Sequence, residues 1–192
     1  MMRILGIDPG LRCTGWGVVA VDGGRLQHIA NGAIRPKSTL DDASRLQIVF
    51  DGLCEVITLY QPNQAAIEQI FVAKSAGSAL RLGMARGVGI LACGVNRLGV
   101  GEISARAVKK AVAGTGTADK KQIQGMVTRL LAVTAQNADA ADALAIAIAA
   151  SNEAGTAASV ELELGKGRAT GGLSAAIAAA LARYNAGNGG KT

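Results

Sequence analysis

The first part of the chain alternates apolar stretches with short turns. An apolar run over residues 3–8 is broken at once by Pro9-Gly10, which is a strong turn signal. A second strand is predicted over residues 15–21, and Asp22-Gly23-Gly24 forms a hairpin turn into a third strand over residues 26–33. Consecutive strands joined by such short turns pair in opposite directions. The pattern therefore predicts an antiparallel three-stranded meander.

From about residue 41 to residue 150 the apolar positions change to helical spacing, interrupted by two short apolar runs. Asp41-Asp42 opens a helix with apolar residues at helical spacing as far as Ile57, and Pro62 follows its end. The elements predicted after it are a strand over 65–68, a helix over 78–98, a strand over 100–103, a helix from Ser104 to Gly114, a helix capped by Thr117 or Asp119 and running to Leu131, and a helix over 138–150. A meander followed by strands that alternate with helices predicts an α/β fold. We expect a mixed five-stranded sheet, antiparallel in the meander and parallel beyond it, with helices on both faces.

The predicted helix over residues 78–98 carries Gly83 and Gly87, which lie one turn apart on one face. Each glycine costs about 1 kcal/mol of helix propensity relative to alanine. We expect the compensation to come from close approach of another helix, either within the fold or across a dimer interface.

Composition sets the limits on this picture. Of the 192 residues, 49% are apolar but only 3% are aromatic, so the core must be aliphatic. The net charge of +6 favours an anionic partner such as nucleic acid. From residue 152 onward Ala, Gly, Ser and Thr dominate. We therefore predict one domain over 1–151 and a mostly disordered tail over 152–192, within which residues 173–184 have helical spacing.

Cysteine usage and hydropathy indicate where the protein works. The three cysteines, Cys13, Cys54 and Cys93, are far apart and form no CxxC pair, so we expect free thiols used as small apolar residues rather than a disulfide or zinc site. The N-terminus lacks the layout of a signal peptide, and no uncharged apolar run reaches the roughly 18 residues of a spanning helix. A cytoplasmic protein without membrane association is predicted.

Four carboxylates occupy positions where an unpaired acid is costly. Asp8 and Glu68 each end a predicted apolar strand, and Asp139 and Asp142 lie three residues apart on one face of an alanine-rich helix. If the strands are neighbours and the helix packs across them, the four acids meet in one place. Oxygen-only ligands suit magnesium or manganese, and two such ions can activate water at a phosphodiester.

Simpler interpretations exist for two of these acids. Asp8 can cap its own turn, and Asp139 can favour the helix dipole, although the dipole explains Asp142 less well. The only histidine, His28, lies in the third strand and is interpreted as structural. Because the chain also lacks a serine or cysteine nucleophile motif, metal-activated water is the chemistry that remains.

Basic residues form two groups suited to a phosphate backbone. The first surrounds the turn Gly114-Thr115-Gly116, and the second contains no acid between its members. The first group is Arg106, Lys109, Lys110, Lys120 and Lys121, and the second is Lys74, Arg81 and Arg86.

These segments together resemble one family. The resemblance rests on Leu5-Gly6-Ile7-Asp8-Pro9-Gly10, Ala66-Ile67-Glu68-Gln69-Ile70-Phe71, Leu82-Gly83-Met84-Ala85-Arg86-Gly87 and the run from Asp139 to Ala145. In this order, and without large gaps over residues 3–151, they resemble the RuvC family of bacterial Holliday-junction resolvases. The tail after Asn152 has no matching pattern.

The resemblance implies an RNase H-like fold and a homodimer that makes paired symmetric nicks in a four-way DNA junction, in recombination and repair. By position, Asp8, Glu68, Asp139 and Asp142 match the catalytic acids, which implies two magnesium ions per subunit with manganese as a substitute. Phe71 matches an aromatic residue that acts on DNA near the crossover, and Lys109 and Lys120 match basic residues at the scissile backbone. The implied partner is the RuvA–RuvB branch-migration complex.

Three alternatives are weaker. Asp8-Pro9-Gly10 with Thr14-Gly15 also resembles the first phosphate loop of actin-like ATPases and sugar kinases, but their second glycine loop and adenosine-binding segment are not found in this sequence. A nuclease of the same fold that acts on RNA precursors is the second alternative. A non-catalytic junction-binding protein is the third, and the four acids argue against it.

Overall fold

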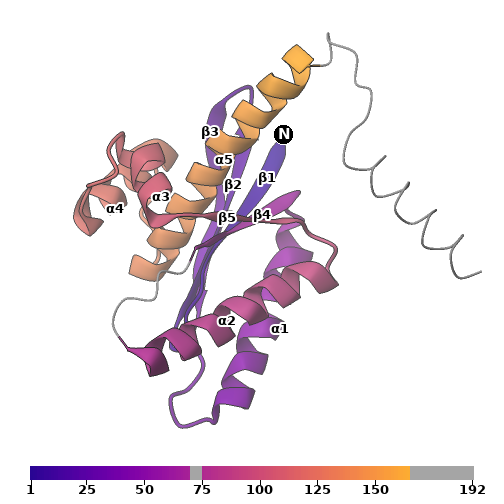
Figure 1. Ribbon diagram of the computed structural model, residues 1–192, viewed down its shortest axis with the longest axis vertical. Coiled ribbons are helices and arrows are strands. Elements are labelled where there is room, and N and C mark those ends of the chain that lie inside the picture. Colours follow the sequence, from indigo (N-terminus) through magenta and orange to yellow (C-terminus); the bar gives the residue numbers. More distant parts are fainter. Residues whose placement is uncertain (70–74, 165–192) are drawn as a thin grey trace, which may run out of the picture. The chain divides into compact units, whose positions relative to one another are not determined.

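The computed structural model describes residues 1–69 and 75–164, with side chains described up to residue 152. Contacts between Cα atoms divide the chain after Ala154, and the site lies in the first unit, Met1–Ala154. Its centre is one five-stranded sheet in the order β3-β2-β1-β4-β5 (Figure 1). The strands are β1 (Met2–Asp8), β2 (Thr14–Asp22), β3 (Arg25–Ile34), β4 (Gln64–Glu68) and β5 (Val100–Ile103).

Strand pairing confirms the predicted mixed sheet. β1 pairs antiparallel with β2, and β2 pairs antiparallel with β3, with an irregularity between Val18 and Val19. β1 also pairs with β4 in parallel, and β4 pairs with β5 in parallel. β1 is therefore the central strand, flanked by the meander on one side and by the parallel strands on the other.

The helices begin where the sequence supplies a cap. They are α1 (Asp42–Tyr60), α2 (Ala76–Val95), α3 (Ala105–Ala113), α4 (Lys120–Leu131) and α5 (Ala138–Leu164). Asp41, Ser75, Ser104 and Asp119 accept hydrogen bonds from free backbone amides in the first turns of α1 to α4. Asp119, not Thr117, caps α4 and forms a capping box with Gln122.

Two predicted helix boundaries were wrong. The helix expected over residues 78–98 spans Ala76–Val95, because Ser75 supplies the cap and Asn96 closes the last turn. The helix expected to stop at residue 150 continues as α5 to Leu164, so the first part of the predicted tail is helical. Alanine, glutamate and leucine in this stretch favour a helix despite Gly155. The predicted tail beyond residue 164 lies outside the described residues.

Helices cover both faces of the sheet, as predicted. On one face, buried side chains of α1 and α2 such as Leu53 and Cys93 pack against Leu5, Ile7 and other strand residues. On the other face, α3, α4 and α5 pack on the opposite side chains of the same strands (Figure 1). Both clusters are aliphatic, which agrees with the low aromatic content.

Glycines in β1 and β2 let α5 lie very close to the sheet. A Cβ atom added at Gly6 would lie 2.0 Å from the backbone oxygen of Ala143, and one at Gly15 would lie 2.1 Å from the backbone oxygen of Asp139. Gly17, which faces Gly6 across the two strands, similarly abuts Leu144. Any larger residue at these positions would push α5 away, so the glycines set the height of the helix above the strands.

The helix α2 presents a small and apolar stripe outward. Leu80, Leu91 and Val95 are 66%, 56% and 63% exposed, and a Cβ atom at Gly83 or Gly87 would meet no heavy atom of the described residues beyond the helix's own backbone. Close approach of another helix at these glycines therefore does not occur among the described parts of the chain. By length and composition alone α2 could cross a membrane, although it contains Arg81 and Arg86, and such a single helix is a weak indication.

Candidate active site

The strand register brings the first two acids together. β1 and β4 are adjacent and parallel, with Ile7 paired to Ile67, so Asp8 and Glu68 follow at the same edge of the sheet. Asp8 also faces Gly15 on β2, and it is at Gly15 that α5 makes its close approach through Asp139. The first turns of α5 are therefore held directly over the ends of β1 and β4.

One pocket of about 250 Å³ collects most of the predicted catalytic side chains. Its polar lining comes from β1, β4, α3, α4 and α5, and its apolar wall includes Val108, Ile123 and Ile146. The polar residues are Asp8, Glu68, Lys109, Lys120 and Asp142. We name this hollow the acid pocket.

Electrostatics in the acid pocket disfavour full ionisation of the strand-borne acids. Burial raises the pKa of Asp8 to about 7, and the nearby carboxylates of Asp142, Glu68 and Asp139 add to this effect. Burial and Asp142 also raise the pKa of Glu68, while Lys120 and Lys109 act in the opposite direction. The pocket holds more negative charge than its two lysines neutralise.

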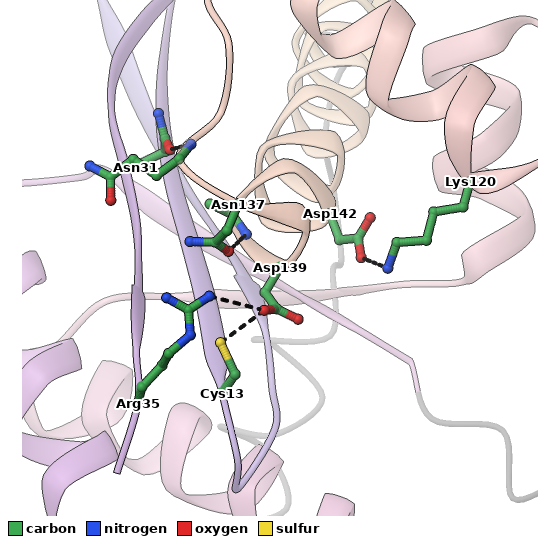
Figure 2. Close-up of polar contacts among 9 residues, drawn as sticks. Cys13, Asn31, Arg35, Lys120, Asn137, Asp139 and Asp142 are labelled. Carbon is green, nitrogen blue, oxygen red and sulfur yellow. Dashed lines mark hydrogen bonds and ion pairs between the residues drawn. The ribbon is translucent and has the colours of Figure 1, made fainter. Parts of the chain in front are cut away.

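Asp142 is held by a lysine. The Lys120 ammonium donates a hydrogen bond to Asp142 Oδ2 at 2.6 Å, which joins α4 to α5 (Figure 2). This bond raises the pKa of Lys120, so the lysine stays charged across the neutral range. A cation is thereby fixed at the edge of the acid pocket.

Asp139 turns to a different set of partners. Its Oδ2 atom accepts a hydrogen bond from the Cys13 thiol at 2.9 Å and lies 3.6 Å from the Arg35 guanidinium (Figure 2). Burial and the hydrogen bond to Asp139 raise the pKa of the Cys13 thiol to about 11, so it stays protonated at neutral pH. The thiol is a hydrogen-bond donor here, which corrects the expectation that all three cysteines are merely small apolar residues.

The start of α5 is anchored independently of the acids. Asn137 Oδ1 accepts a hydrogen bond from the backbone amide of Ala140, so Asn137 caps the helix. Asn31 of β3 accepts one from the backbone amide of Gln136 and bonds to His28, which supports the structural role predicted for that histidine. These bonds tie the first turn of α5 to the meander (Figure 2).

The turn after β1 is closed without help from Asp8. The Thr14 hydroxyl donates to the backbone oxygen of Gly10 at 2.8 Å and accepts from the Gly10 amide. A capping role for Asp8 is thus not needed, and the carboxylate is left to the acid pocket.

The donor set of the acid pocket fits a hard divalent cation. Its acids offer only carboxylate oxygens, and burial together with the neighbouring carboxylates raises the pKa of Asp8, so a bound cation would stabilise the ionised form. Among the described residues no three His, Cys, Asp or Glu side chains are already arranged as a ligand set. Asp142 pairs with Lys120 and Asp139 with Arg35. The structure brings Asp8, Glu68 and Asp142 into one pocket and turns Asp139 away from it.

The predicted DNA-binding residues are spread more widely. Arg106 and Lys110 are exposed on α3 and Lys121 is exposed on α4, the two helices that also supply Lys109 and Lys120 to the acid pocket, whereas Arg81 lines a separate groove. The Arg86 guanidinium pairs with Glu102 at 2.6 Å and donates to the backbone oxygen of Glu68, so it supports the end of β4. DNA contact by Arg86 stays a prediction. Phe71 and Lys74 lie outside the described residues.

Comparison with known proteins identifies the family. The model of the crossover junction endodeoxyribonuclease RuvC family matches residues 4–150. The chain belongs to the RuvC family. A RuvC from Caulobacter sp. (strain K31) is 51% identical over 152 residues, which cover 79% of this chain and 90% of the relative. One from Saccharophagus degradans is 53% identical over 149 residues, covering 77% and 86% of the two chains.

A solved RuvC structure confirms the fold. The Thermus thermophilus RuvC in complex with Holliday junction substrate superposes with a TM-score of 0.78 at 28% identity, over 82% of this chain and 97% of that one. The RNase H-like fold implied by the resemblance is therefore confirmed. RuvC proteins are metal-dependent endodeoxyribonucleases that cut crossover junctions in recombination and repair, and this match favours that activity over the three alternatives considered from the sequence.

Proposed function

We propose that this protein resolves four-way DNA junctions by paired symmetric nicks, with Asp8, Glu68, Asp139 and Asp142 as the metal ligands. The observation that carries the proposal is the acid pocket, where oxygen-only donors from two strands and one helix converge beside two lysines. Two magnesium ions per subunit, for which manganese substitutes, are the ions that this donor chemistry suits best.

Each side chain then has a distinct task. When bound, such ions supply a water nucleophile at neutral pH and stabilise the leaving oxygen of the phosphodiester. Asp8 and Glu68 are fixed by the strand ends, and Asp142 and Asp139 would hold the ions in place of their present partners, Lys120 and Arg35. Lys109 and Lys120 lie at the pocket and stabilise charge that develops on the scissile phosphate. The exposed basic residues Arg106, Lys110 and Lys121 hold the DNA backbone.

The outward stripe of α2 supports a homodimer. Leu80, Gly83, Gly87 and Leu91 recur at intervals of three or four residues, which places them on one face of the helix. Small residues in such a stripe let two helix backbones approach closely, and the exposed leucines supply apolar area to bury. We propose that α2 of one subunit packs on the partner's α2, so that two acid pockets serve the two strands to be cut.

The cellular setting follows from this role. Junction resolution is the step after branch migration, so we propose that the protein works with the RuvA–RuvB complex. Cys13, Cys54 and Cys93 are free thiols, which suits a reducing compartment and supports the predicted cytoplasmic location.

A mixing experiment tests the function and the dimer together. Wild-type protein is combined with an excess of Asp8→Asn protein and given a supercoiled plasmid that extrudes a cruciform, with magnesium. Mixed dimers with one intact pocket should yield nicked circles, whereas wild-type dimers yield linear product. Persistence of linear product in proportion to the wild-type protein alone would mean that the two pockets do not act within one dimer. Absence of magnesium-dependent cutting by wild-type protein would overturn the proposed function itself.

A further inference from the structure

A second hollow lies on the far side of Asp139 from the acid pocket. It has a volume of about 860 Å³ and is formed by the turn after β1, the residue after β3, and the first halves of α1 and α2. Its charged lining is Arg12, Arg35, Arg45 and Arg81, with Asp139 as the single carboxylate. We name it the arginine groove. The serines Ser38 and Ser78 add hydroxyl groups to the same surface.

The protein neutralises the positive charge of this groove only in part. Among residues 1–69 and 75–152, whose side chains are described, neither Arg12 nor Arg81 makes a side-chain hydrogen bond or ion pair with another residue. Within the same part of the chain, the one ion pair of Arg35 is with the carboxylate of Asp139, at 3.6 Å. Four cations that face one hollow repel one another, so their positions favour a multiply charged anion as the occupant.

One of the four is built into the fold. The Arg45 side chain is only 12% exposed, donates to the backbone oxygen of Leu11 at 3.0 Å and pairs with Asp42 at 3.5 Å. Its Nε atom is buried and has no hydrogen-bond partner among the described residues. Arg45 therefore fixes the turn that carries Arg12 and leaves a cation at the floor of the groove.

The groove and the acid pocket are adjacent parts of one surface. Asp139 lines the groove and Asp142, three residues later on the same helix, lines the acid pocket. Figure 2 shows Arg35 and Cys13 next to Asp139, and Lys120 of α4 next to Asp142. The two hollows therefore lie about one turn of α5 apart, close enough for one extended polyanion to span both.

We propose that the arginine groove binds the sugar–phosphate backbone of the DNA strand next to the phosphate that is cut. Arg12 and Arg35 are the phosphate contacts, Arg81 closes the groove from α2, and Ser38 and Ser78 donate hydroxyl groups. Guanidinium groups suit this task because their planar fork can donate two parallel hydrogen bonds to one phosphate. The inference rests on the proposed function, since it assigns the path of the substrate through the same site.

Phosphate binding at Arg35 would also affect Asp139. A phosphate in the groove competes with Asp139 for the Arg35 guanidinium, because both are anions within reach of the same group. Occupation of the groove therefore removes one of the two groups that hold Asp139 and leaves the Cys13 thiol as the other. Arg12 has no contact with Asp139, so its substitution reports on the groove alone.

The test compares arginines at the two ends of β3. Arg12→Gln and Arg35→Gln remove charge from the groove, and Arg25→Gln removes the same charge at the other end of the strand, roughly 30 Å away for ten residues of β structure. Binding to a labelled four-way junction is measured with EDTA over a series of salt concentrations. We expect each groove variant to weaken binding several-fold and to lower the slope of log affinity against log salt by about 1, and the Arg25 variant to change neither.

Two outcomes would overturn the inference. Unchanged salt slopes for Arg12→Gln and Arg35→Gln, or an equal change for Arg25→Gln, would mean that the groove does not hold the backbone. Thermal unfolding of each variant shows whether a loss of binding comes from misfolding, and Arg12, exposed on its turn, is the variant least coupled to the fold. Magnesium-dependent nicking of the same junction by wild-type protein is measured in parallel. It tests the proposed function independently of the binding results for the groove variants.

Discussion

The two strand-borne acids and the two helix-borne acids of the site are held in different ways. Asp8 and Glu68 end neighbouring strands, and within residues 1–69 and 75–164 no salt bridge involves either of them. Asp139 and Asp142 lie in the first turns of α5, and each meets a cationic side chain, Arg35 or Lys120. The strand acids thus carry a cost of burial that no ion pair among these residues offsets, whereas each helix acid has a cationic partner.

The backbone thus sets where each of the four acids lies, but only the helix acids have side-chain partners that orient their carboxylates. The strand acids are placed by backbone pairing, which does not depend on side-chain partners. Their raised pKa values show that the ionised carboxylates are disfavoured in the folded protein. The helix acids are placed by α5, which the glycines of β1 and β2 hold close, but their carboxylates are oriented by exchangeable partners. Metal binding should therefore relieve the strand acids and re-orient the helix acids.

The largest expected effect is the loss of nicking in all four acid variants. Asp8→Asn, Glu68→Gln, Asp139→Asn and Asp142→Asn should each lower nicking by more than the roughly 10- to 100-fold that loss of a supporting residue costs in a metal site. Junction binding should be largely retained, because the basic residues hold the DNA. Cleavage and binding of a labelled junction measure the two effects separately. Retained cutting by Asp142→Asn protein would assign that residue to the helix dipole.

The free energy of unfolding should distinguish a strand-acid variant, Asp8→Asn, from a helix-acid variant, Asp142→Asn. Each pKa unit is worth about 1.4 kcal/mol, so ionised Asp8 costs the folded protein at most about 4 kcal/mol in EDTA, and Asp8→Asn should recover part of this at about pH 8. Asp142→Asn breaks the pair with Lys120 and should change stability by no more than about 1 kcal/mol. Urea unfolding in EDTA measures both. Equal shifts for the two variants would contradict the distinction.

The next largest effect concerns the lysines of the acid pocket. Lys120→Ala and Lys109→Ala should reduce the cutting rate by about 100-fold or more and reduce binding far less, because a cation at the scissile phosphate acts mainly on the transition state. Lys121→Ala is the matched comparison, since Lys121 is the exposed neighbour on α4 and should affect binding but not the rate at saturating DNA. Single-turnover cutting and equilibrium binding are measured for all three. Parallel losses in both quantities would make Lys120 an ordinary backbone contact.

The raised pKa of Asp8 predicts a pH dependence of metal activation. With a pKa of about 7, Asp8 is protonated at lower pH in EDTA-treated protein, and protons then compete with the metal. Below about pH 7 the magnesium concentration for half-maximal nicking should rise up to roughly tenfold for each unit of pH. The raised pKa also affects stability in EDTA. Between about pH 4 and about pH 7 the folded protein binds more protons at Asp8 than the unfolded chain does, so the free energy of unfolding should fall as pH rises. A half-maximal magnesium concentration that is constant across this range would show that Asp8 is not a ligand.

Local signals in the sequence predicted most of the fold. Helix starts were predicted at Asp41-Asp42 and Ser104, and Asp119 was one of two candidate caps of the next helix, because a cap acts on amides only two or three residues away. The meander and the parallel strands followed from apolar runs and turns. The end of α5 was missed because a change in composition at Asn152 was interpreted as a change in structure, although alanine and glutamate continue a helix well.

The partners of the site could not be predicted in the same way. The Cys13 thiol and Asp139 are 126 residues apart in the sequence, and a single cysteine in a turn gives no signal of its neighbour. Arg35 follows β3 and is ordinary in sequence, yet the sheet brings it to the same carboxylate. Such contacts depend on strand order and on the height of α5, which are tertiary properties.

The smallest expected effect tests whether Cys13 orients Asp139. Because its pKa is about 11, the thiol remains a donor at neutral pH, and Cys13→Ala removes one of the two groups that hold the carboxylate. A hydrogen bond of this kind contributes about 0.5–1 kcal/mol, so the half-maximal magnesium concentration should change by only about two- to fivefold. Cys13→Ser keeps a donor in place and should behave like wild-type protein. Because alanine and serine are similar in size, packing alone would affect both variants equally, and an equal change in magnesium dependence would therefore assign Cys13 to packing rather than to the orientation of Asp139.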